Sequence, residues 1–251
     1  ELGISGAAIA SSLAEMGSLI VLCIYTGVKI DKEKYGLKPV YDGRLLIKVL
    51  NLSVWSMLHA FISVAPWFLF FVAIEHLGKT ELAISNITRS VSAIFFVIAN
   101  SFAVTTGSLV SNAIGAGARK ELFPICHKVL KLGYAVGFPL VVVALLCNRW
   151  IVSFYTDNEL LVELAFAPFV VMLLNYTFAL PGYVYLNAVG GTGKTKITFL
   201  FQVTTTCVYL VYLYWLSFCI EASLSLYLTA EYLFVILLAL QSIIYLKSKH
   251  Y

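Results

Sequence analysis

Residues 50–74 read LNLSVWSMLHAFISVAPWFLFFVAI and contain no Asp, Glu, Lys or Arg. A helix of about 20 apolar residues crosses the hydrocarbon core of a bilayer, where the backbone must satisfy its own hydrogen bonds. The rest of the chain is similar in character, because 61% of its 251 residues are hydrophobic, 12% are charged and the mean hydropathy is +0.91. The stretch therefore predicts a transmembrane helix, and the composition predicts an integral membrane protein.

Apolar runs of similar length recur along the chain. Spans are expected near Ile4–Thr26, Leu50–Ile74, Leu82–Val110, Val129–Cys147, Leu160–Leu186, Ile197–Cys219 and Ser225–Leu246. These runs lack the two-residue alternation, over about 10 residues, that marks the strands of an outer-membrane barrel. The predicted fold class is an all-α integral membrane protein of about seven transmembrane helices.

The basic residues indicate the topology. Successive loops, followed by the C-terminal segment, carry six, one, four, one, two, no and two Lys or Arg residues. Because Lys and Arg of short loops stay in the cytoplasm, this alternation predicts an outside N-terminal end and a cytoplasmic C-terminus in a multi-pass protein of the cell (plasma) membrane. Acidic residues interrupt the most basic loop, 29–48, so we expect a solvated topology signal there and no nucleic-acid partner.

Residues 190–195, GGTGKT, imitate a phosphate-binding loop, but Ala188 stands where that loop needs its first glycine, and a membrane helix precedes the motif. No nucleotide partner is expected.

The five cysteines are scattered singly, which predicts neither a metal site nor a cofactor nor a disulfide framework. No nucleophile and base are grouped at the membrane ends, so the chain is not expected to be an enzyme.

Ionisable side chains inside spans indicate where function could lie, because each costs about 2.5–3.5 kcal/mol at a helix centre and usually faces a cavity. Glu75 and Arg89 lie on the outer side of adjacent antiparallel spans, which favours an ion pair between them, with snorkelling of Arg89 to the interface as the alternative. Glu15 and Glu231 are deeper and are candidate proton sites. His59 is more typical of a packed histidine than of a proton carrier.

Amide and phenol groups complete the set. Asn86, Arg89 and Asn100 follow a helical spacing with Ala93 and Val97, so one face of the third span is expected to be polar. The candidate substrate-binding or coupling residues are Glu15, His59, Glu75, Asn86, Arg89, Asn100, Asn175, Tyr176, Tyr183, Asn187 and Glu231. Bonding between helices is the alternative for the amides and phenols.

Five segments, in order, resemble the multidrug and toxic compound extrusion (MATE) family. They are GISGAAIA at 3–10, WFLFF at 67–71 followed by EHLG at 75–78, LAISNI at 82–87, LVSNAIGAG at 109–117 and FYTD at 154–157. The resemblance implies twelve helices in two six-helix lobes. It would make residues 1–28 the last helix of the first lobe, 29–48 a cytoplasmic inter-lobe loop, and 49–251 the second lobe. The partner of this lobe would be the N-terminal lobe of the same protein, which is missing from this sequence. The odd number of spans and the first residue, Glu1, are then explained by an earlier segment.

The resemblance also implies an antiporter of the cell membrane that exports small organic cations or drugs by alternating access, without a cofactor. Sodium-coupled members of the family carry acidic residues in the middle of their seventh and tenth helices, but none occurs in 50–74 or 164–186. The coupling ion is left open between proton and sodium. A flippase for lipid-linked oligosaccharides or other precursors and a seven-helix membrane receptor remain alternatives. The third span lacks the acidic-Arg-aromatic triplet of receptors, and the seventh has no proline.

Overall fold

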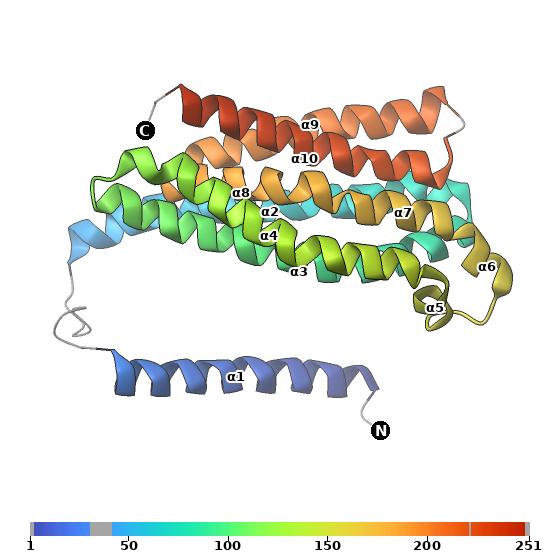
Figure 1. Ribbon diagram of the computed structural model, residues 1–251, viewed down its shortest axis with the longest axis horizontal. Coiled ribbons are helices and arrows are strands. Elements are labelled where there is room, and N and C mark those ends of the chain that lie inside the picture. Colours follow the sequence, from blue (N-terminus) through green and yellow to red (C-terminus); the bar gives the residue numbers. More distant parts are fainter. Residues whose placement is uncertain (1–2, 31–41, 221, 249–251) are drawn as a thin grey trace. The chain divides into compact units, whose positions relative to one another are not determined.

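The computed structural model of the chain describes residues 3–30, 42–220 and 222–248 (Figure 1). Every regular element in these ranges is a helix. The chain divides into two units, Glu1–Lys48 and Val49–Tyr251. Each unit is described by itself. Residues 31–41, most of the predicted inter-lobe loop, lie outside the described ranges, and the assignment of 1–28, 29–48 and 49–251 to two lobes stays a prediction.

In the described ranges, seven long apolar helices or helix groups confirm the predicted fold class. They are α1 (Gly3–Lys29), α2 (Gly43–Ile74), α3 (Lys79–Gly115), α4 (Leu122–Leu146), the series α6 (Glu159–Leu164), α7 (Phe166–Leu174) and α8 (Tyr176–Gly191), α9 (Thr195–Cys219) and α10 (Leu224–Lys247). Short elements join them: η1 (Glu75–Leu77), η2 (Arg119–Glu121) and α5 (Asn148–Ser153). All seven are long and apolar enough to cross a membrane, so the chain is a multi-pass membrane protein.

Helix α2 begins at Gly43, earlier than the predicted start at Leu50. Asp42 is its N-cap, since one carboxylate oxygen accepts hydrogen bonds from the amides of Arg44 at 2.9 Å and Leu45 at 3.2 Å. An aspartate at this position satisfies amides that the first helical turn leaves free. The cap sets the start of the helix, and the hydropathy profile does not detect it.

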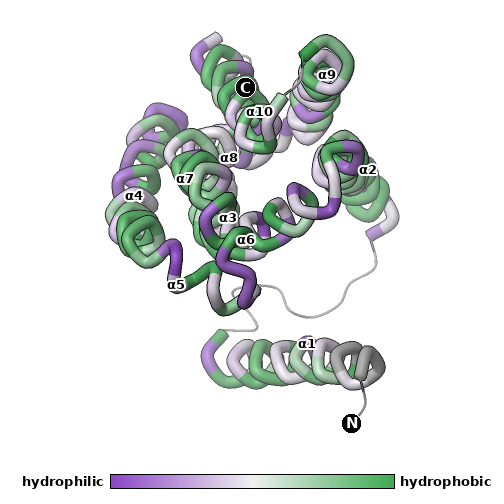
Figure 2. Tube along the Cα trace, turned by 90° about the vertical axis from the view of Figure 1, so that its right-hand side faces the viewer, coloured by the Kyte–Doolittle hydropathy of each residue, from purple (hydrophilic) through white to green (hydrophobic). Residues whose placement is uncertain are grey.

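The core of the second unit lies around α8, which packs against α3, α4, α9 and α10. Figure 2 looks along the bundle and shows α7 and α8 among these helices. Two glycines permit the close packing. A Cβ on Gly137 of α4 would lie 2.2 Å from the Tyr176 ring, and one on Gly182 would lie 2.7 Å from the Val235 carbonyl oxygen. Small residues at such crossings let membrane helices approach closely.

The predicted span Leu160–Leu186 is one membrane crossing built from three helices, with turns at Ala165 and Asn175. Proline has no N–H, so Pro168 and Pro181 each leave a carbonyl one turn earlier without its helical partner. The carbonyl freed by Pro181 belongs to Thr177, and it accepts a hydrogen bond of 2.7 Å from the Tyr134 hydroxyl of α4. The neighbouring helix thus replaces the bond that proline removes.

Candidate functional site

A buried ion pair joins α3 to α10. Nη2 of Arg89 lies 2.6 Å from Oε1 of Glu231, and the two side chains are 2% and 15% exposed. The hydroxyl of Tyr209, from α9, donates a second hydrogen bond of 3.3 Å to the same Oε1. The predicted Glu75–Arg89 pair is therefore wrong. Glu75 is exposed in η1, at the end of α2, whereas Phe70 and Ile74 are the buried residues of the last turns of that helix.

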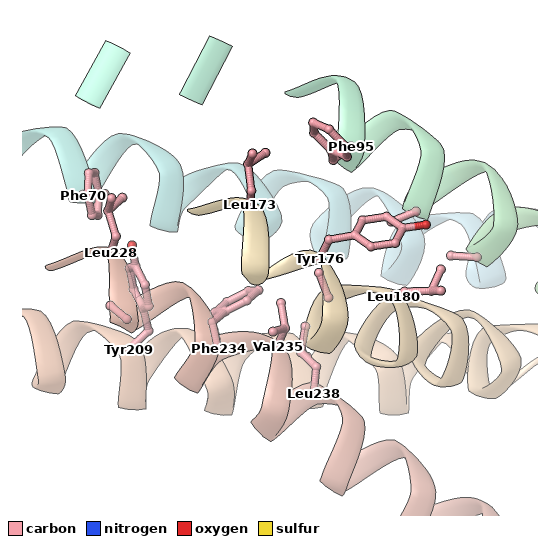
Figure 3. Packing of buried hydrophobic residues seen from close by; sticks show 14 of the residues in the cluster. Phe70, Phe95, Leu173, Tyr176, Leu180, Tyr209, Leu228, Phe234, Val235 and Leu238 are labelled. Carbon is pink, nitrogen blue, oxygen red and sulfur yellow. The ribbon is translucent and has the colours of Figure 1, made fainter. Parts of the chain in front are cut away.

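Aromatic rings of α2 surround the guanidinium of Arg89. Its Cζ lies 4.1 Å from the ring centroid of Phe70, 5.4 Å from Phe71 and 5.6 Å from Trp67. A cation over aromatic faces is stabilised by about 2 kcal/mol or more when water is excluded. Figure 3 shows Phe70, Leu228 and Tyr209 together in this part of the core. Arg89 therefore does not snorkel to the interface, because its charge is compensated inside the bundle.

Several polar atoms at this centre have no partner within the described residues. Nε and Nη1 of Arg89 are buried without an acceptor, and Oδ1 of Asn175 is buried without a donor. Asn175 is 8% exposed and Arg89 is 3% exposed. Buried polar groups left unpaired cost about 1–3 kcal/mol each, so such groups mark positions where a ligand or water can complete the bonding.

These groups border a cavity of about 340 Å³. Its aromatic walls come from α2, α3, α8 and α10: Trp67, Phe95, Phe96, Tyr176, Tyr183 and Phe234. Its polar groups include Arg89, Ser92, Asn175 and Glu231. Figure 3 shows Phe95, Tyr176 and Phe234 on the helices that enclose it. A mostly apolar cavity of this size with a few convergent polar groups is typical of a small-molecule site.

A second, polar cavity of about 630 Å³ lies where α8 turns into α9. Its lining includes Ser56 and His59 of α2, Ser108, Ser111 and Asn112 of α3, Asn187 of α8, and Thr195 and Thr198 of α9. Nε2 of His59 is buried there without a partner in the described part of the chain. Gly191 and Gly107 meet at this cavity, since a Cβ on Gly191 would lie 2.5 Å from the Gly107 oxygen. The turn continues through Gly193, at φ +80°.

The structure brings together some of the predicted site residues and separates others. Five line the aromatic cavity: Arg89, Asn175, Tyr176, Tyr183 and Glu231. His59 and Asn187 line the polar cavity instead. Glu15 is exposed on α1, in the other unit, and Glu75, Asn86 and Asn100 are exposed within the second unit. The seven residues that line cavities are therefore the candidates on geometric grounds.

The polar face predicted for the third span holds only in part. Arg89 points inward, but Asn86 is exposed and donates to the Leu82 carbonyl of its own helix at 3.1 Å. Asn100 lies on nearly the same helical face as Arg89 and is also exposed. At the level of Arg89, rings of α2 cover this face of α3, and this cover is what buries Arg89.

Sequence reasoning missed Tyr209, Trp67 and Phe70 as site residues. Tyr209 belongs to a series of polar residues at helical spacing in α9, and that spacing was the available signal. The two rings of α2 gave no local signal, because most aromatic residues in membrane helices serve packing. Arg89 in the adjacent third span was the only indication that these two rings could face a cation.

Residues 56–216 match the model of the MatE family. The chain belongs to this family. The match covers α3, α4 and α8, and most of α2 and α9, so it includes Arg89 and Tyr209 and ends before Glu231. A search of the curated proteins found no match.

Solved structures of MATE proteins share the fold. A MATE structure in a bent conformation is 18% identical with a TM-score of 0.69, over 79% of this chain and 44% of that chain. A MATE transporter from Vibrio cholerae is 16% identical with a TM-score of 0.71, over 82% and 46%. A MOP superfamily transporter from Pyrococcus furiosus, described as having a binding pocket of reverse polarity, is 17% identical with a TM-score of 0.66, over 78% and 43%.

The chain spans less than half the length of the solved transporters that it matches. Its size fits one lobe of a MATE transporter, as the resemblance in sequence implies. Membership of the MatE family argues against the receptor alternative. At these identities the solved structures establish the fold alone, and the cargo and the coupling ion are matters for proposal.

Proposed function

We propose that this chain forms half of a cation-coupled antiporter of the cell membrane that exports amphipathic organic cations by alternating access. The observation that carries the proposal is the aromatic cavity with its buried Arg89–Glu231 pair. Aromatic walls suit flat organic molecules. Within the described residues, both hydrogen bonds to the Glu231 carboxylate end on Oε1, so Oε2 is the oxygen left to face a cationic cargo.

The proposed role of Glu231 follows from charge balance. A proton or sodium ion bound to Glu231 would compete with an organic cation for the same carboxylate. Competition for one site couples the movement of the ion to the movement of the cargo. Arg89 would hold the carboxylate in place and neutralise it when neither ligand is present. Asn175, with an unpaired carbonyl oxygen, would accept a hydrogen bond from an N–H of the cargo.

Export can be tested by dye accumulation in cells that express the full two-lobe protein. Wild-type protein is expected to lower the accumulation of ethidium, and Arg89→Ala and Glu231→Gln are expected to abolish this effect. Glu75→Gln is the matched control, since it removes a carboxylate that is exposed outside the cavity. Unchanged accumulation on expression of the wild type, or full efflux by Arg89→Ala, would contradict the proposal.

A flippase for lipid-linked precursors is the second candidate, and one observation favours it. Nε and Nη1 of Arg89 are buried donors without acceptors, and arginine is well suited to the phosphates of such lipids. This function predicts that loss of the two-lobe protein stops envelope synthesis without changing drug sensitivity. The antiporter predicts the reverse pattern, so one deletion strain separates the two.

A further inference from the structure

The buried face of α9 is mostly polar. Thr198, Gln202, Thr205, Thr206 and Tyr209 are all buried, and only Leu213 and Leu216 complete the set of buried residues on this helix. Their spacing of three or four residues places them on one face, which packs against α8 and α10. A buried hydroxyl stripe is costly in a membrane protein unless its groups are bonded.

The central hydroxyls of this stripe have no hydrogen-bond partner among the residues that the structure describes. Oγ1 of Thr205 and Thr206 and Oγ of Ser242, on the facing helix α10, are buried and unbonded within the described residues. Thr204, next to them, is exposed, and its hydroxyl bonds to Leu200, Phe201 and Gln241. Helix-to-helix bonding therefore does not account for the buried hydroxyls. Buried polar groups of this kind are the usual partners of internal water, which makes two to four hydrogen bonds.

The stripe connects the two cavities. At one end, the Tyr209 hydroxyl donates to Oε1 of Glu231 at 3.3 Å. At the other end, Thr198 lines the polar cavity that also contains His59, at the end of the bundle predicted to be cytoplasmic. Along α9 these ends are eleven residues apart, or about 16 Å at 1.5 Å per residue.

The spacing suits single water molecules. Steps of three or four residues between Thr198, Gln202, Thr205/Thr206 and Tyr209 rise by about 4.5–6 Å. One water that accepts one hydrogen bond and donates another spans about 5.6 Å between its partners. A continuous chain from Tyr209 to the polar cavity therefore needs about one water per step.

We propose that this stripe is a proton path that connects Glu231 with the polar cavity; the inference rests on the proposed antiport and names the proton as its coupling ion. Protonated Glu231 gives its proton to the Tyr209 oxygen while the Tyr209 hydroxyl proton passes to the water next to Thr205 and Thr206. Tyr209 is neutral before and after, and one proton reaches the polar cavity by way of water at Gln202 and Thr198. Glu231 regains its charge and pairs with Arg89.

The groups that face Glu231 are consistent with this cycle. They are Arg89 from α3, Tyr209 from α9 and, across the aromatic cavity, Tyr183 from α8. Arg89 is the only permanent charge among them, and it is placed to pair with the Glu231 carboxylate after the proton has left. His59, from α2, is the titratable group of the polar cavity and lies where the path ends.

The test uses the full two-lobe protein in liposomes that contain a pH-sensitive dye. Thr205→Val together with Thr206→Val keeps the shape of the stripe and removes its hydroxyls, and Thr204→Val is the matched control. With ethidium as cargo, proton movement in the double variant is expected to slow about a hundredfold, the lower range for a positioned proton-transfer group, while ethidium affinity is unchanged. Thr205→Ser with Thr206→Ser keeps the hydroxyls and is expected to restore the rate.

A second readout separates this inference from the proposed function. After a pH step without cargo, infrared spectroscopy follows the carboxylic-acid band of Glu231, which is identified by its loss in Glu231→Gln. Slow protonation in the Val pair and normal protonation in Thr204→Val would support the path even if ethidium is not exported. Equal rates in the Val pair, the Ser pair and the control would overturn it, and so would cargo exchange that depends on sodium and not on pH.

Discussion

The aromatic cavity and the polar cavity of the second unit differ in the kind of polar groups that they contain. The aromatic cavity, about 340 Å³, contains the Arg89–Glu231 pair among rings, and the polar cavity, about 630 Å³, is lined largely by hydroxyls and amides. A charge kept from water needs a counter-charge from the protein, whereas hydroxyl and amide groups in a more open cavity can exchange their partners for water. Removing one polar group should therefore cost much in the first cavity and little in the second.

The largest effect is expected for Arg89→Ala. The substitution leaves Glu231 buried without its counter-charge, which costs about 3–5 kcal/mol of the free energy of unfolding. Thermal unfolding of the purified protein in detergent would measure the loss. Adding Glu231→Gln removes the stranded charge, so the double variant is expected to recover most of the stability. An equal loss in the single and double variants would show that the pair is not coupled in this way.

This centre also shows where sequence reasoning reached its limit. Long apolar runs give the seven spans directly, because lipid permits only helices with satisfied backbones there. The partner of Arg89 is 142 positions away, and no local pattern points to it. The nearby Glu75 was the natural choice from adjacent antiparallel helices, but its position beyond the last turn of α2 leaves it exposed.

The polar cavity was predictable to a smaller extent. The membrane helix expected before residues 190–195 is α8, and the chain turns there through Gly193, which has a positive φ. The contact between Gly191 and Gly107 depends on how α3 crosses the end of α8, which follows from packing and not from either segment alone. His59 and Asn187 were selected as polar residues in spans, but nothing in the sequence placed them in a cavity apart from Arg89.

Substitutions in the polar cavity are expected to cost little free energy of unfolding, and Gly191→Ala is expected to be the exception. The new Cβ would lie 2.5 Å from a backbone oxygen of Gly107, which cannot rotate away, so the helices must separate at a cost of about 1–3 kcal/mol. Gly115→Ala is the matched control, because its Cβ would meet nothing within 4 Å. A lower melting temperature for the first variant and no loss for the second are expected. Similar melting temperatures would mean that α3 and α8 do not cross so closely.

Tyr209→Phe tests the edge of the aromatic cavity with a smaller change. It removes the hydroxyl that donates to Glu231 and leaves the ring, which is fully buried and packs against Phe234. Loss of a hydrogen bond to a charged group costs about 1.5–3 kcal/mol, reduced here because Arg89 still holds Oε1 and the bond is long. We expect a loss near 1 kcal/mol, measured by thermal unfolding. A loss as large as that of Arg89→Ala would mean that Tyr209, and not Arg89, is the main partner of Glu231.

Ser111→Ala should have the smallest effect and sharpens the comparison most directly. Its hydroxyl donates to the Gly191 carbonyl at 2.8 Å in the polar cavity, and the residue is exposed. Water can take over the carbonyl, so the expected loss is about 0.5 kcal/mol or less, at the lower limit for a single hydrogen bond. Thermal unfolding of Ser111→Ala is compared with that of Tyr209→Phe, because each variant loses one hydroxyl, from the polar and the aromatic cavity respectively. If both variants lose the same free energy, burial does not distinguish the two cavities, and the expected difference in the cost of removing one hydroxyl is wrong.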